Sequence, residues 1–477
     1  MLKKTKIVAT VSSLNCAPSF IERLYQAGMN VVRLNTAHMT HENALEIITA
    51  TRSVSDRIGL LLDTKGPEIR TCEMEATLTV KSGDTIRIKG APGEVSRGDQ
   101  VFVSHRDFVQ DIPAGSSILI DDGHIGLKVI EKSCDFLICL VENDGEIKEK
   151  KSVNIPSVHV KLPALSEKDK AFIRFAADQD LDFIAHSFVR NKEDVQAVQQ
   201  ILDEKRSPIK IIAKIENSEG VSNLDEILDS VYGVMIARGD LAVEIPTERI
   251  PMIQKKIIRT CIERRRPVIV ATQMLHSMID SPRPTRAEVS DVANACLDYA
   301  DALMLSGETA SGKFPEIAVR TMAKIISEVE DTNEGYLNIP YHHENRITAY
   351  LAKAAVKAAL RLNTRAIVAD SLTGKSILAL SAYRGGNIIY AQIYDRHVMR
   401  HLSLSYGVYA NYLPMDADSA ESLKQEICRL VDERQFADDD LIIVLAGSFG
   451  ASLGASYIEI AVAGEMKKKC FLPRPEG

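Results

Sequence analysis

Eight short apolar strands, most of them separated by amphipathic helical stretches, recur through the first two-thirds of this 477-residue chain. They lie near residues 6–9, 31–35, 59–63, 183–187, 211–215, 234–237, 268–271 and 302–305. Strands this apolar are typical of a parallel sheet that is buried on both faces. Alternating strands and helices predict an α/β fold, and eight such units predict a closed (β/α)8 TIM barrel.

Polar residues follow these strands at their C-terminal ends. In the segment 211–217, Lys214 and Glu216 share one strand face, because side chains alternate faces along a strand. A lysine and a carboxylate directed into a core are costly unless they pair, bind a metal or do chemistry. A structural ion pair would explain one such site. Arg33, Asp63 and Asp240 repeat the pattern, and the C-terminal strand ends are where this barrel keeps its active site.

The remaining sequence predicts an insertion and an appendage. Short alternating β patterns at 77–80, 85–88, 118–120, 126–130 and 136–141 predict a small β-barrel domain over residues 69–159, placed as a lid over the mouth of the barrel. The barrel would then comprise residues 1–68 and 160–338. A helix at 349–362, with strands at 366–369, 387–390, 408–412 and 441–445, predicts a C-terminal α/β domain over 339–477 for effector binding or oligomerisation.

Composition narrows the class of protein. A net charge of −7 argues against a nucleic-acid partner. The basic run 264–266 is expected to close a helix, and the run 467–469 to connect to a last strand. Eight dispersed cysteines without metal-binding spacing fit a reducing compartment. No stretch has the length of a membrane span and the start lacks a signal peptide, so we expect a cytoplasmic protein without a membrane partner.

The candidate site residues indicate a chemistry before any family is considered. Glu216 and Asp240 are oxygen ligands suited to one Mg²⁺ or Mn²⁺ ion. Asn35, Asp63 and Thr64 offer oxygens for a second, monovalent cation. Cations suited to a phosphorylated substrate are Arg33, Arg70, Lys151 and Lys214. The residues alone predict a metal-dependent barrel enzyme acting on a phosphorylated or carboxylated small molecule.

Six segments carry a resemblance to the bacterial-type pyruvate kinase family. They are residues 62–70 (LDTKGPEIR), 213–217 (AKIEN), 237–241 (ARGDL), 271–275 (ATQML), 282–294 (PRPTRAEVSDVAN) and 304–310 (MLSGETA). The resemblance covers the whole chain in order. It implies a glycolytic kinase that transfers a phosphoryl group from phosphoenolpyruvate to ADP, giving pyruvate and ATP, and it implies a homotetramer.

The resemblance also implies roles for individual residues. Catalytic roles fall to Lys214, Arg33, Thr272 and Ser306, the last two near the path of a proton to the enolate carbon. Arg33, Lys214, Gly239, Asp240 and Thr272 would bind phosphoenolpyruvate, and Asn35, His38, Arg70 and Lys151 the nucleotide. Mg²⁺ would be bound by Glu216 and Asp240, and K⁺ by Asn35, Asp63 and Thr64. Glu68 is the residue that in this family accompanies potassium dependence.

The sequence departs from the family pattern in several places. Ala37 replaces a serine whose hydroxyl is expected on potassium, so we expect weakened K⁺ binding. Ser152 and Ser157 replace two glycines of the lid hinge, which predicts a stiffer hinge. Ala242 and His276 replace a glycine and a glutamate. None of these changes removes Lys214 or a magnesium ligand.

A loop in the C-terminal domain suggests an allosteric effector site. Ser371, Thr373, Gly374, Lys375 and Ser376 join a strand to a helix and resemble the family's phosphate loop for sugar-phosphate or nucleotide activators. An ordinary turn in a vestigial site explains the same residues equally well. The loop is not a Walker motif, because an alanine precedes it where the first glycine is required.

Two other functions remain as alternatives. A Mg²⁺-dependent lyase or aldolase acting on a pyruvate enolate would use the same barrel and carboxylates, but it has no need of a lid or of the Lys214–Glu216 pair. A catalytically silent regulator that binds a phosphorylated metabolite would not need Lys214, Glu216, Asp240 and Thr272 intact.

Overall fold

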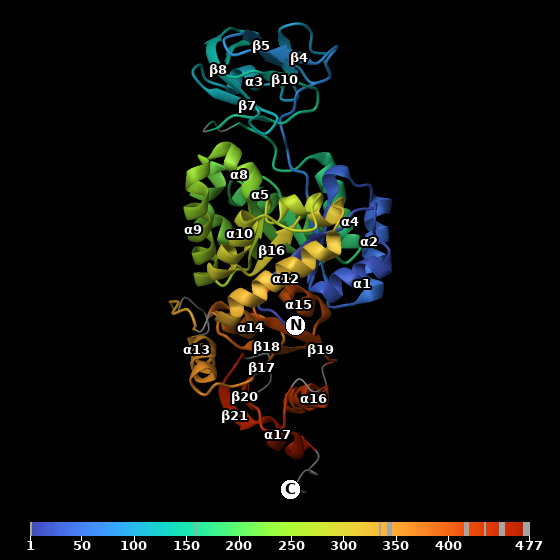
Figure 1. Ribbon diagram of the computed structural model, residues 1–477, viewed down its shortest axis with the longest axis vertical. Helices are drawn as coiled ribbons and strands as arrows, with labels where there is room; N and C mark the ends of the chain where they lie inside the picture. The colour runs from blue at the N-terminus through green and yellow to red at the C-terminus, as the bar shows by residue number, and fades with distance from the viewer. Residues whose placement is uncertain are drawn as a thin grey trace.

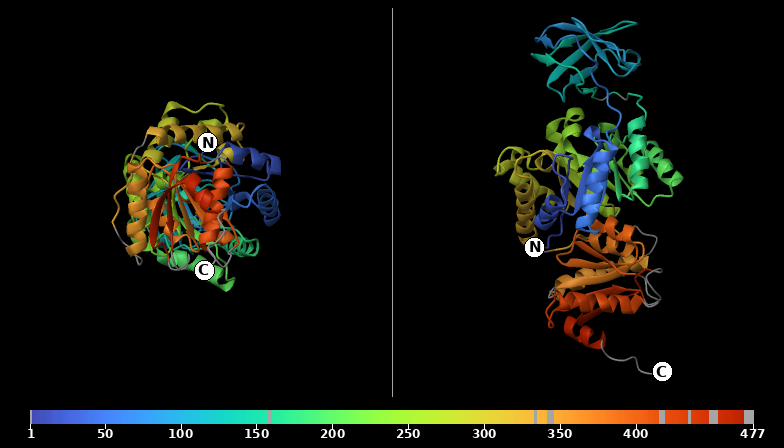
Figure 2. Two further views of the ribbon diagram at one scale, coloured as in Figure 1. Left: turned by 90° about the horizontal axis from the view of Figure 1, so that it is seen from below. Right: turned by 90° about the vertical axis from the view of Figure 1, so that its right-hand side faces the viewer.

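The computed structural model describes residues 2–156, 158, 160–332, 335–340, 346–414, 419–433, 436–447 and 454–470. Figure 1 shows three parts stacked along the long axis of the molecule, with the β insertion above, the barrel in the middle and the C-terminal part below. The side view in Figure 2 shows the same order. Two extended connections join the insertion to the barrel.

The central part is a closed parallel barrel, which confirms the predicted fold. Its strands are β1 (Lys6–Thr10), β2 (Val31–Asn35), β3 (Gly59–Asp63), β12 (Phe183–His186), β13 (Lys210–Ile215), β14 (Gly233–Ala237), β15 (Val268–Ala271) and β16 (Ala302–Leu305). They follow one another around the barrel in chain order, and β16 pairs with β1. The register places Asn35 beside Asp63 and Asp63 beside Ala185.

Two apolar layers explain why these strands are hydrophobic on both faces. Val31, Leu61, Phe183 and Ile212 belong to a cluster that fills the barrel interior. Alternate residues, such as Leu62 on β3, pack outward in the cluster shared with the helices. Burial on both sides removes the polar alternation of a half-exposed strand, which is why these runs could be recognised in the sequence.

Helices surround the barrel. They are α1 (Pro18–Ala27), α2 (His41–Val54), α4 (Glu167–Asp178), α5 (Lys192–Glu204), α6 (Ser218–Ser222), α7 (Leu224–Leu228), α8 (Arg238–Glu244), α9 (Ile250–Glu263), α10 (Arg286–Leu297), α11 (Gly307–Ala310) and α12 (Pro315–Thr332), with short 3-10 turns η1 (Thr36–His38), η2 (Thr247–Arg249) and η3 (His276–Ile279). Ser166 caps α4 and pairs reciprocally with Asp169, which satisfies backbone donors where the chain returns from the insertion.

The insertion forms a β structure with its own apolar core. Its elements are β4 (Leu78–Val80), β5 (Thr85–Gly90), β6 (Gln100–Val103), α3 (Phe108–Asp111), β7 (Ser117–Ile120), β8 (Ile125–Lys132), β9 (Leu137–Val141), β10 (Gly145–Ile147) and β11 (Val153–Asn154). Six strands form one sheet, and β4 and β10 form a second, two-stranded one. The five predicted strands are present. Strands β6, β10 and β11 were not predicted.

The C-terminal part is a five-stranded sheet with helices. It contains α13 (Arg346–Arg361), β17 (Ala366–Ser371), α14 (Lys375–Ala382), β18 (Ile388–Ile393), α15 (Arg396–His401), η4 (Leu402–Leu404), β19 (Val408–Tyr412), α16 (Ser419–Asp432), β20 (Leu441–Ala446), β21 (Tyr457–Val462) and α17 (Ala463–Cys470). Strand β21, antiparallel to β20, was not predicted. The lysine run 467–469 lies within helix α17, so its interpretation as a connector was wrong.

The C-terminal part packs against the lower end of the barrel, where the strands begin, and covers it. Leu404 of η4 packs into the interior cluster of the barrel. Asp182, directly before β12, accepts a hydrogen bond from Arg400 at 2.6 Å, and Asp301, before β16, accepts one from Arg384 at 2.5 Å. The opposite end of the barrel is therefore the one available for ligands. None of the helices in the described ranges is both long enough and apolar enough to cross a membrane.

Candidate active site

A buried network of ion pairs centres on Lys214 near the C-terminal end of β13. The Lys214 ammonium lies 3.0 Å from Asp63 Oδ1 and 2.9 Å from Glu216 Oε1, and it donates a hydrogen bond to Ser187 Oγ at 2.7 Å. Asp63 and Glu216 are at most 1% exposed and Lys214 is 9% exposed. Removing one member of such a buried network would leave an uncompensated charge. Lys214 and Glu216 lie close enough to pair, as their predicted position on one face of the strand requires.

Arg33 extends this network to strand β2. Its Nε lies 2.7 Å from Asp63 Oδ2, and one terminal nitrogen donates to Thr10 Oγ1 at 3.0 Å. Burial by itself would raise the pKa of Asp63, but Lys214 and Arg33 outweigh burial and hold that pKa below its ordinary value. Burial also disfavours the charged form of Lys214, yet Asp63 and Glu216 raise its pKa. Lys214 is therefore charged at neutral pH.

Glu216 and Asp240 form an acidic pair beside the network. Burial raises the pKa of Glu216 to about 7, and the nearby Asp240 contributes to that rise. Burial likewise raises the pKa of Asp240. Glu216 is buried and Asp240 is partly buried, and a divalent cation would favour the charged forms of both carboxylates. The described residues contain no group of three His, Cys, Asp or Glu side chains able to hold a metal, so remaining ligands would come from water or substrate.

The two residues before Asp240 are hydrogen-bonded to Thr272, which follows strand β15. The Gly239 amide donates to Thr272 Oγ1 at 2.9 Å, and Arg238 donates to the Thr272 carbonyl at 2.6 Å and to Asp291 at 2.7 Å. Thr272 and Gln273 both have positive φ angles, of 67° and 56°. Non-glycine residues with a left-handed backbone conformation are strained, and this strain persists only when neighbouring contacts hold the backbone in place. These bonds fix the Thr272 hydroxyl against helix α8.

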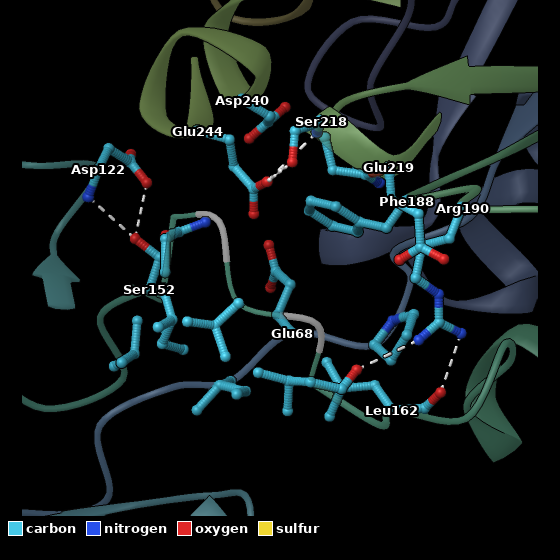
Figure 3. A pocket seen from close by; sticks show the side chains of 18 residues that line it. Glu68, Asp122, Ser152, Leu162, Phe188, Arg190, Ser218, Glu219, Asp240 and Glu244 are labelled. Carbon is cyan, nitrogen blue, oxygen red and sulfur yellow. Dashed lines mark hydrogen bonds between the residues drawn. The ribbon is translucent and has the colours of Figure 1, made fainter. Parts of the chain in front are cut away.

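A cleft separates the insertion from the mouth of the barrel, as Figure 3 shows. Asp122 and Ser152 line it from the insertion, and Asp240 and Glu244 line it from helix α8. Its other lining residues are Pro67, Glu68, Ile69, Val153, Asn154, Ile155, Val158, Val160, Leu162, Phe188, Arg190, Asn217, Ser218 and Glu219. The cleft is therefore closed on one side by the insertion and reaches the acidic pair through Asp240.

The predicted nucleotide-binding residues come from both the insertion and the barrel. Arg70 donates to Glu68 at 2.8 Å and to the Lys150 carbonyl at 2.6 Å. Lys151 pairs with Asp121 at 2.8 Å. Asn35 ends β2, and His38 closes the turn η1 that follows, although the side chain of His38 lies outside the described residues. Arg70 and Lys151 lie on the connections of the insertion, whereas Asn35 and His38 lie on the barrel.

The predicted potassium ligands lie side by side, but their oxygens already accept hydrogen bonds. Asp63 uses one carboxylate oxygen toward Arg33 and the other toward Lys214. The Thr64 carbonyl accepts from the Ser187 hydroxyl at 2.6 Å, and Asn35 Oδ1 accepts from the Ala37 amide at 3.2 Å. The methyl group of Ala37 offers no ligand. The oxygen set therefore suits a cation less well than it would with a serine at position 37.

The remaining predicted site residues are Ser306 and the loop 371–376 of the C-terminal part. The Ser306 amide donates to Glu308 at 2.7 Å at the end of β16. In the loop, the Ser371 hydroxyl accepts from the Gly374 amide at 3.0 Å, and the Ser376 hydroxyl donates to Ser371 at 3.1 Å. The loop residues Thr373, Gly374 and Lys375 line a cavity between α14, α15 and the barrel. The loop joins β17 to α14, which Figure 1 shows below the barrel, whereas Lys214 lies near the C-terminal end of β13. The hinge residue Ser157 lies outside the described residues.

Three residues that contact the network were not identified from the sequence. Ser187 accepts a hydrogen bond from Lys214, Thr10 accepts one from Arg33, and the Phe188 amide donates to Glu216 Oε2 at 2.7 Å. Face alternation from Phe183 and Ala185 would have placed Ser187 inside the barrel. The Phe188 contact is made by the backbone, so no side-chain pattern reveals it.

Comparisons with known proteins agree along the whole chain. The family model "Pyruvate kinase, barrel domain" matches residues 2–319, and "Pyruvate kinase, alpha/beta domain" matches residues 350–461. A pyruvate kinase of Borreliella burgdorferi is 44% identical over 96% of this chain and 97% of its own. One of Bacillus licheniformis is 39% identical over 98% and 82%. A crystal structure of a pyruvate kinase from Cryptosporidium parvum superposes with a TM-score of 0.90 at 34% identity, covering 97% and 96%.

Proposed function

The chain belongs to the pyruvate kinase family, and we propose that the Lys214 network and the acidic pair beside it form its catalytic centre. The enzyme is a phosphotransferase of glycolysis that transfers a phosphoryl group from phosphoenolpyruvate to ADP, giving pyruvate and ATP. The observation that carries the assignment of the centre is the buried contact of Lys214 with both Asp63 and Glu216, next to Asp240 and the cleft.

The family implies a divalent cation, and we propose Mg²⁺, or Mn²⁺ in its place, held by Glu216 and Asp240. When bound, the ion would neutralise charge on substrate oxygens. Support comes from the raised pKa of both carboxylates in its absence, because a nearby cation is what such a pair requires. The Phe188 amide donates to Oε2 of Glu216 and the Lys214 ammonium lies 2.9 Å from Oε1, so the ion would share a Glu216 oxygen with one of these donors and would also contact the carboxylate of Asp240.

Lys214 and Arg33 would bind the phosphoryl group during its transfer. Phosphoryl transfer needs little covalent chemistry from a protein and depends on positioning and on stabilising negative charge. The Lys214 ammonium is held rigidly by two carboxylates and Ser187. Donors that are fixed in place before the reaction need no reorganisation when the phosphoryl charge develops.

Thr272, Gly239 and Asp240 would seat the carboxylate end of phosphoenolpyruvate. The amide-to-hydroxyl bond between Gly239 and Thr272 supports this proposal, since it holds the Thr272 hydroxyl at the start of α8. Thr272 and Ser306 end neighbouring strands β15 and β16. That position supports a role for both hydroxyls in delivering a proton to the enolate carbon.

Nucleotide binding is proposed at the faces of the insertion and the barrel that meet at the cleft. Arg70 and Lys151 would contact the phosphates of ADP from the insertion, and Asn35 and His38 from the barrel. Movement of the insertion, over residues 69–159, would then close the cleft and exclude water from the phosphoryl group. The cleft between Ser152 and Asp240 supports a lid of this kind.

We further propose potassium binding at Asn35, Asp63 and Thr64, weakened by Ala37. Residues 1–68 and 160–338 would form the catalytic domain and 339–477 the effector and oligomerisation domain of a cytoplasmic homotetramer. A phosphorylated metabolite is proposed to activate the enzyme at Ser371, Thr373, Gly374, Lys375 and Ser376. The internal hydrogen bonds of Ser371 and Ser376 are also compatible with an ordinary turn.

The test is pyruvate formation from phosphoenolpyruvate, with omission of one component at a time. We expect turnover with ADP and Mg²⁺ and none without ADP or with a chelator. Pyruvate release without ADP would indicate a lyase. No turnover by folded protein under any of these conditions would indicate a silent binding protein.

A further inference from the structure

The two connections of the lid and two residues of the catalytic centre meet at one short segment, residues 187–190 after strand β12. Ser187 accepts a hydrogen bond from Lys214, and the Phe188 amide donates to Glu216. Phe188 has a φ angle of 56°, in the left-handed region. A backbone held in this conformation is strained in a non-glycine residue, so neighbouring contacts must fix it.

The outgoing connection of the lid, which leaves the barrel after strand β3, packs against the segment 187–190. A Cβ atom on Gly66 would lie 2.8 Å from the Phe188 ring and 2.9 Å from Ser187. The Gly66 φ angle of 74° also favours glycine. Asp169 accepts hydrogen bonds from the amides of Lys65 and Gly66, at 3.0 and 3.4 Å. The outgoing connection is therefore fixed by close packing and by a buried carboxylate.

The returning connection of the lid, which leads from strand β11 back to helix α4, is held by Arg190. Its guanidinium donates to the Leu162 carbonyl at 2.9 Å and to the Val160 carbonyl at 3.4 Å. Figure 3 shows the side chain reaching down from the barrel to this connection. Asp194 binds the other edge of Arg190 through both carboxylate oxygens, at 2.9 Å each. Such a paired geometry orients the guanidinium, which is the property that distinguishes arginine from lysine.

We propose that Arg190 is a positioning residue for phosphoryl transfer, which sets the returning connection of the lid against the segment that holds Lys214 and Glu216. Arg190 lines the far side of the cleft from Asp122 and acts through the backbone. Its effect should therefore fall on substrates that the lid contacts. This inference rests on the reaction assigned above, and on the placement of Arg70 and Lys151 on the lid.

The test compares Arg190→Lys with the matched change Arg87→Lys. Arg87 forms the same two-bond pair with Asp99, but on the exposed surface of the insertion. We expect Arg190→Lys to lower kcat/KM for ADP by about tenfold or more, since small misplacements of reacting groups have effects of this size. The KM for phosphoenolpyruvate should change less than twofold. Arg87→Lys should leave both constants at wild-type values.

A merely structural role is distinguished by two further measurements. The thermal midpoints of both variants should agree, whereas amide exchange of residues 160–165 should be faster only in Arg190→Lys. If Arg190→Lys fails to fold, Asp194→Asn, which keeps the shape of the partner, must show the same selective loss. The proposal would be overturned if Arg190→Lys and Arg87→Lys had equal kcat/KM values for ADP. It would also be overturned if Arg190→Lys lost equal kcat/KM for ADP and for phosphoenolpyruvate. An inactive wild type would instead refute the assigned reaction.

Discussion

Replacing Lys214 with methionine should separate catalysis from metal binding. The substitution keeps the length and much of the volume of the side chain but removes an ammonium that lies 3.0 Å from Asp63 and 2.9 Å from Glu216. Asp63 keeps Arg33 as an ion-pair partner at 2.7 Å, whereas among the described residues no cation remains paired with Glu216, which keeps the hydrogen bond from the Phe188 amide. Most of the uncompensated charge therefore falls on Glu216.

The magnitudes follow from the geometry. Each ion pair of Lys214 is worth about 5 kcal/mol of attraction at an effective dielectric constant of about 20, before the cost of desolvation. Breaking a buried pair from one side typically costs about 3–5 kcal/mol of stability. Because the pKa of Glu216 is already about 7, protonation relieves much of its charge at neutral pH. We therefore expect a destabilisation near the lower end, about 3 kcal/mol.

Catalysis should respond far more strongly. Removing one preorganised donor to a developing charge lowers kcat by about 100- to 1000-fold, and we expect at least this loss. Binding of Mn²⁺ should be unchanged or tighter, because the substitution removes a positive charge from beside Glu216. The assays are coupled pyruvate formation, Mn²⁺ titration by electron paramagnetic resonance, and urea unfolding of the metal-free protein.

Lys210→Met is the matched control on the same strand. Lys210 begins β13 at the opposite end of the barrel, and burial lowers its pKa. Its replacement should leave turnover and Mn²⁺ binding at wild-type values. Turnover of Lys214→Met within tenfold of wild type would refute the role of Lys214 at the phosphoryl group. Loss of Mn²⁺ binding together with turnover would make Lys214 a structural part of the metal site.

Three further predictions concern cations and effectors. Because folding raises the pKa of Glu216 from 4.5 to about 7, the folded state binds this proton more tightly than the unfolded chain, so metal-free protein should lose stability as pH rises through that window. Saturating Mn²⁺ should abolish this dependence in urea unfolding; an unchanged slope would contradict the acidic pair as the metal site. Activity should rise with K⁺ at fixed ionic strength, and Ala37→Ser should lower the half-saturating concentration about tenfold, the effect of about 1.4 kcal/mol from one added ligand; a flat titration refutes the argument from Glu68. A panel of sugar phosphates and AMP should shift the phosphoenolpyruvate saturation curve, and Gly374→Asp should abolish the shift; an identical curve throughout indicates an ordinary turn.

The barrel could be predicted because its strands are buried on both faces, and the insertion because its short strands alternate apolar and polar residues. Asp121, Asp122 and Gly123 are residues that favour turns, and all three adopt positive φ angles between β7 and β8. Strand β21 (Tyr457–Val462) was missed because the last strand was expected to follow the lysine run 467–469. That run also follows a helical pattern, and helix α17 includes it. Local pattern does not distinguish an edge strand from its flanking helix.

The proposed catalytic centre was predictable where side chains carry the contact. Lys214 and Glu216 were found by alternation along β13, and their distance agrees with that reasoning. The contacts of the Phe188 amide and of Arg190 with carbonyl groups involve the backbone, which every residue shares. The sequence alone therefore identifies the charged centre but does not identify what positions it.

Charged residues flank the barrel strands at both ends, and only their partners reveal which end is catalytic. Asp182 and Asp301 at the lower end are as deeply buried as Asp63, but Arg400 and Arg384 from the C-terminal part satisfy them. These pairs fasten one part of the molecule to another and leave no charge for a ligand. At the upper end, burial raises the pKa of Glu216 and of Asp240, as it does for Asp301, but among the described residues Asp240 forms no ion pair with a cation. An unsatisfied charge balance, rather than burial or the presence of charge, is what marks a functional site.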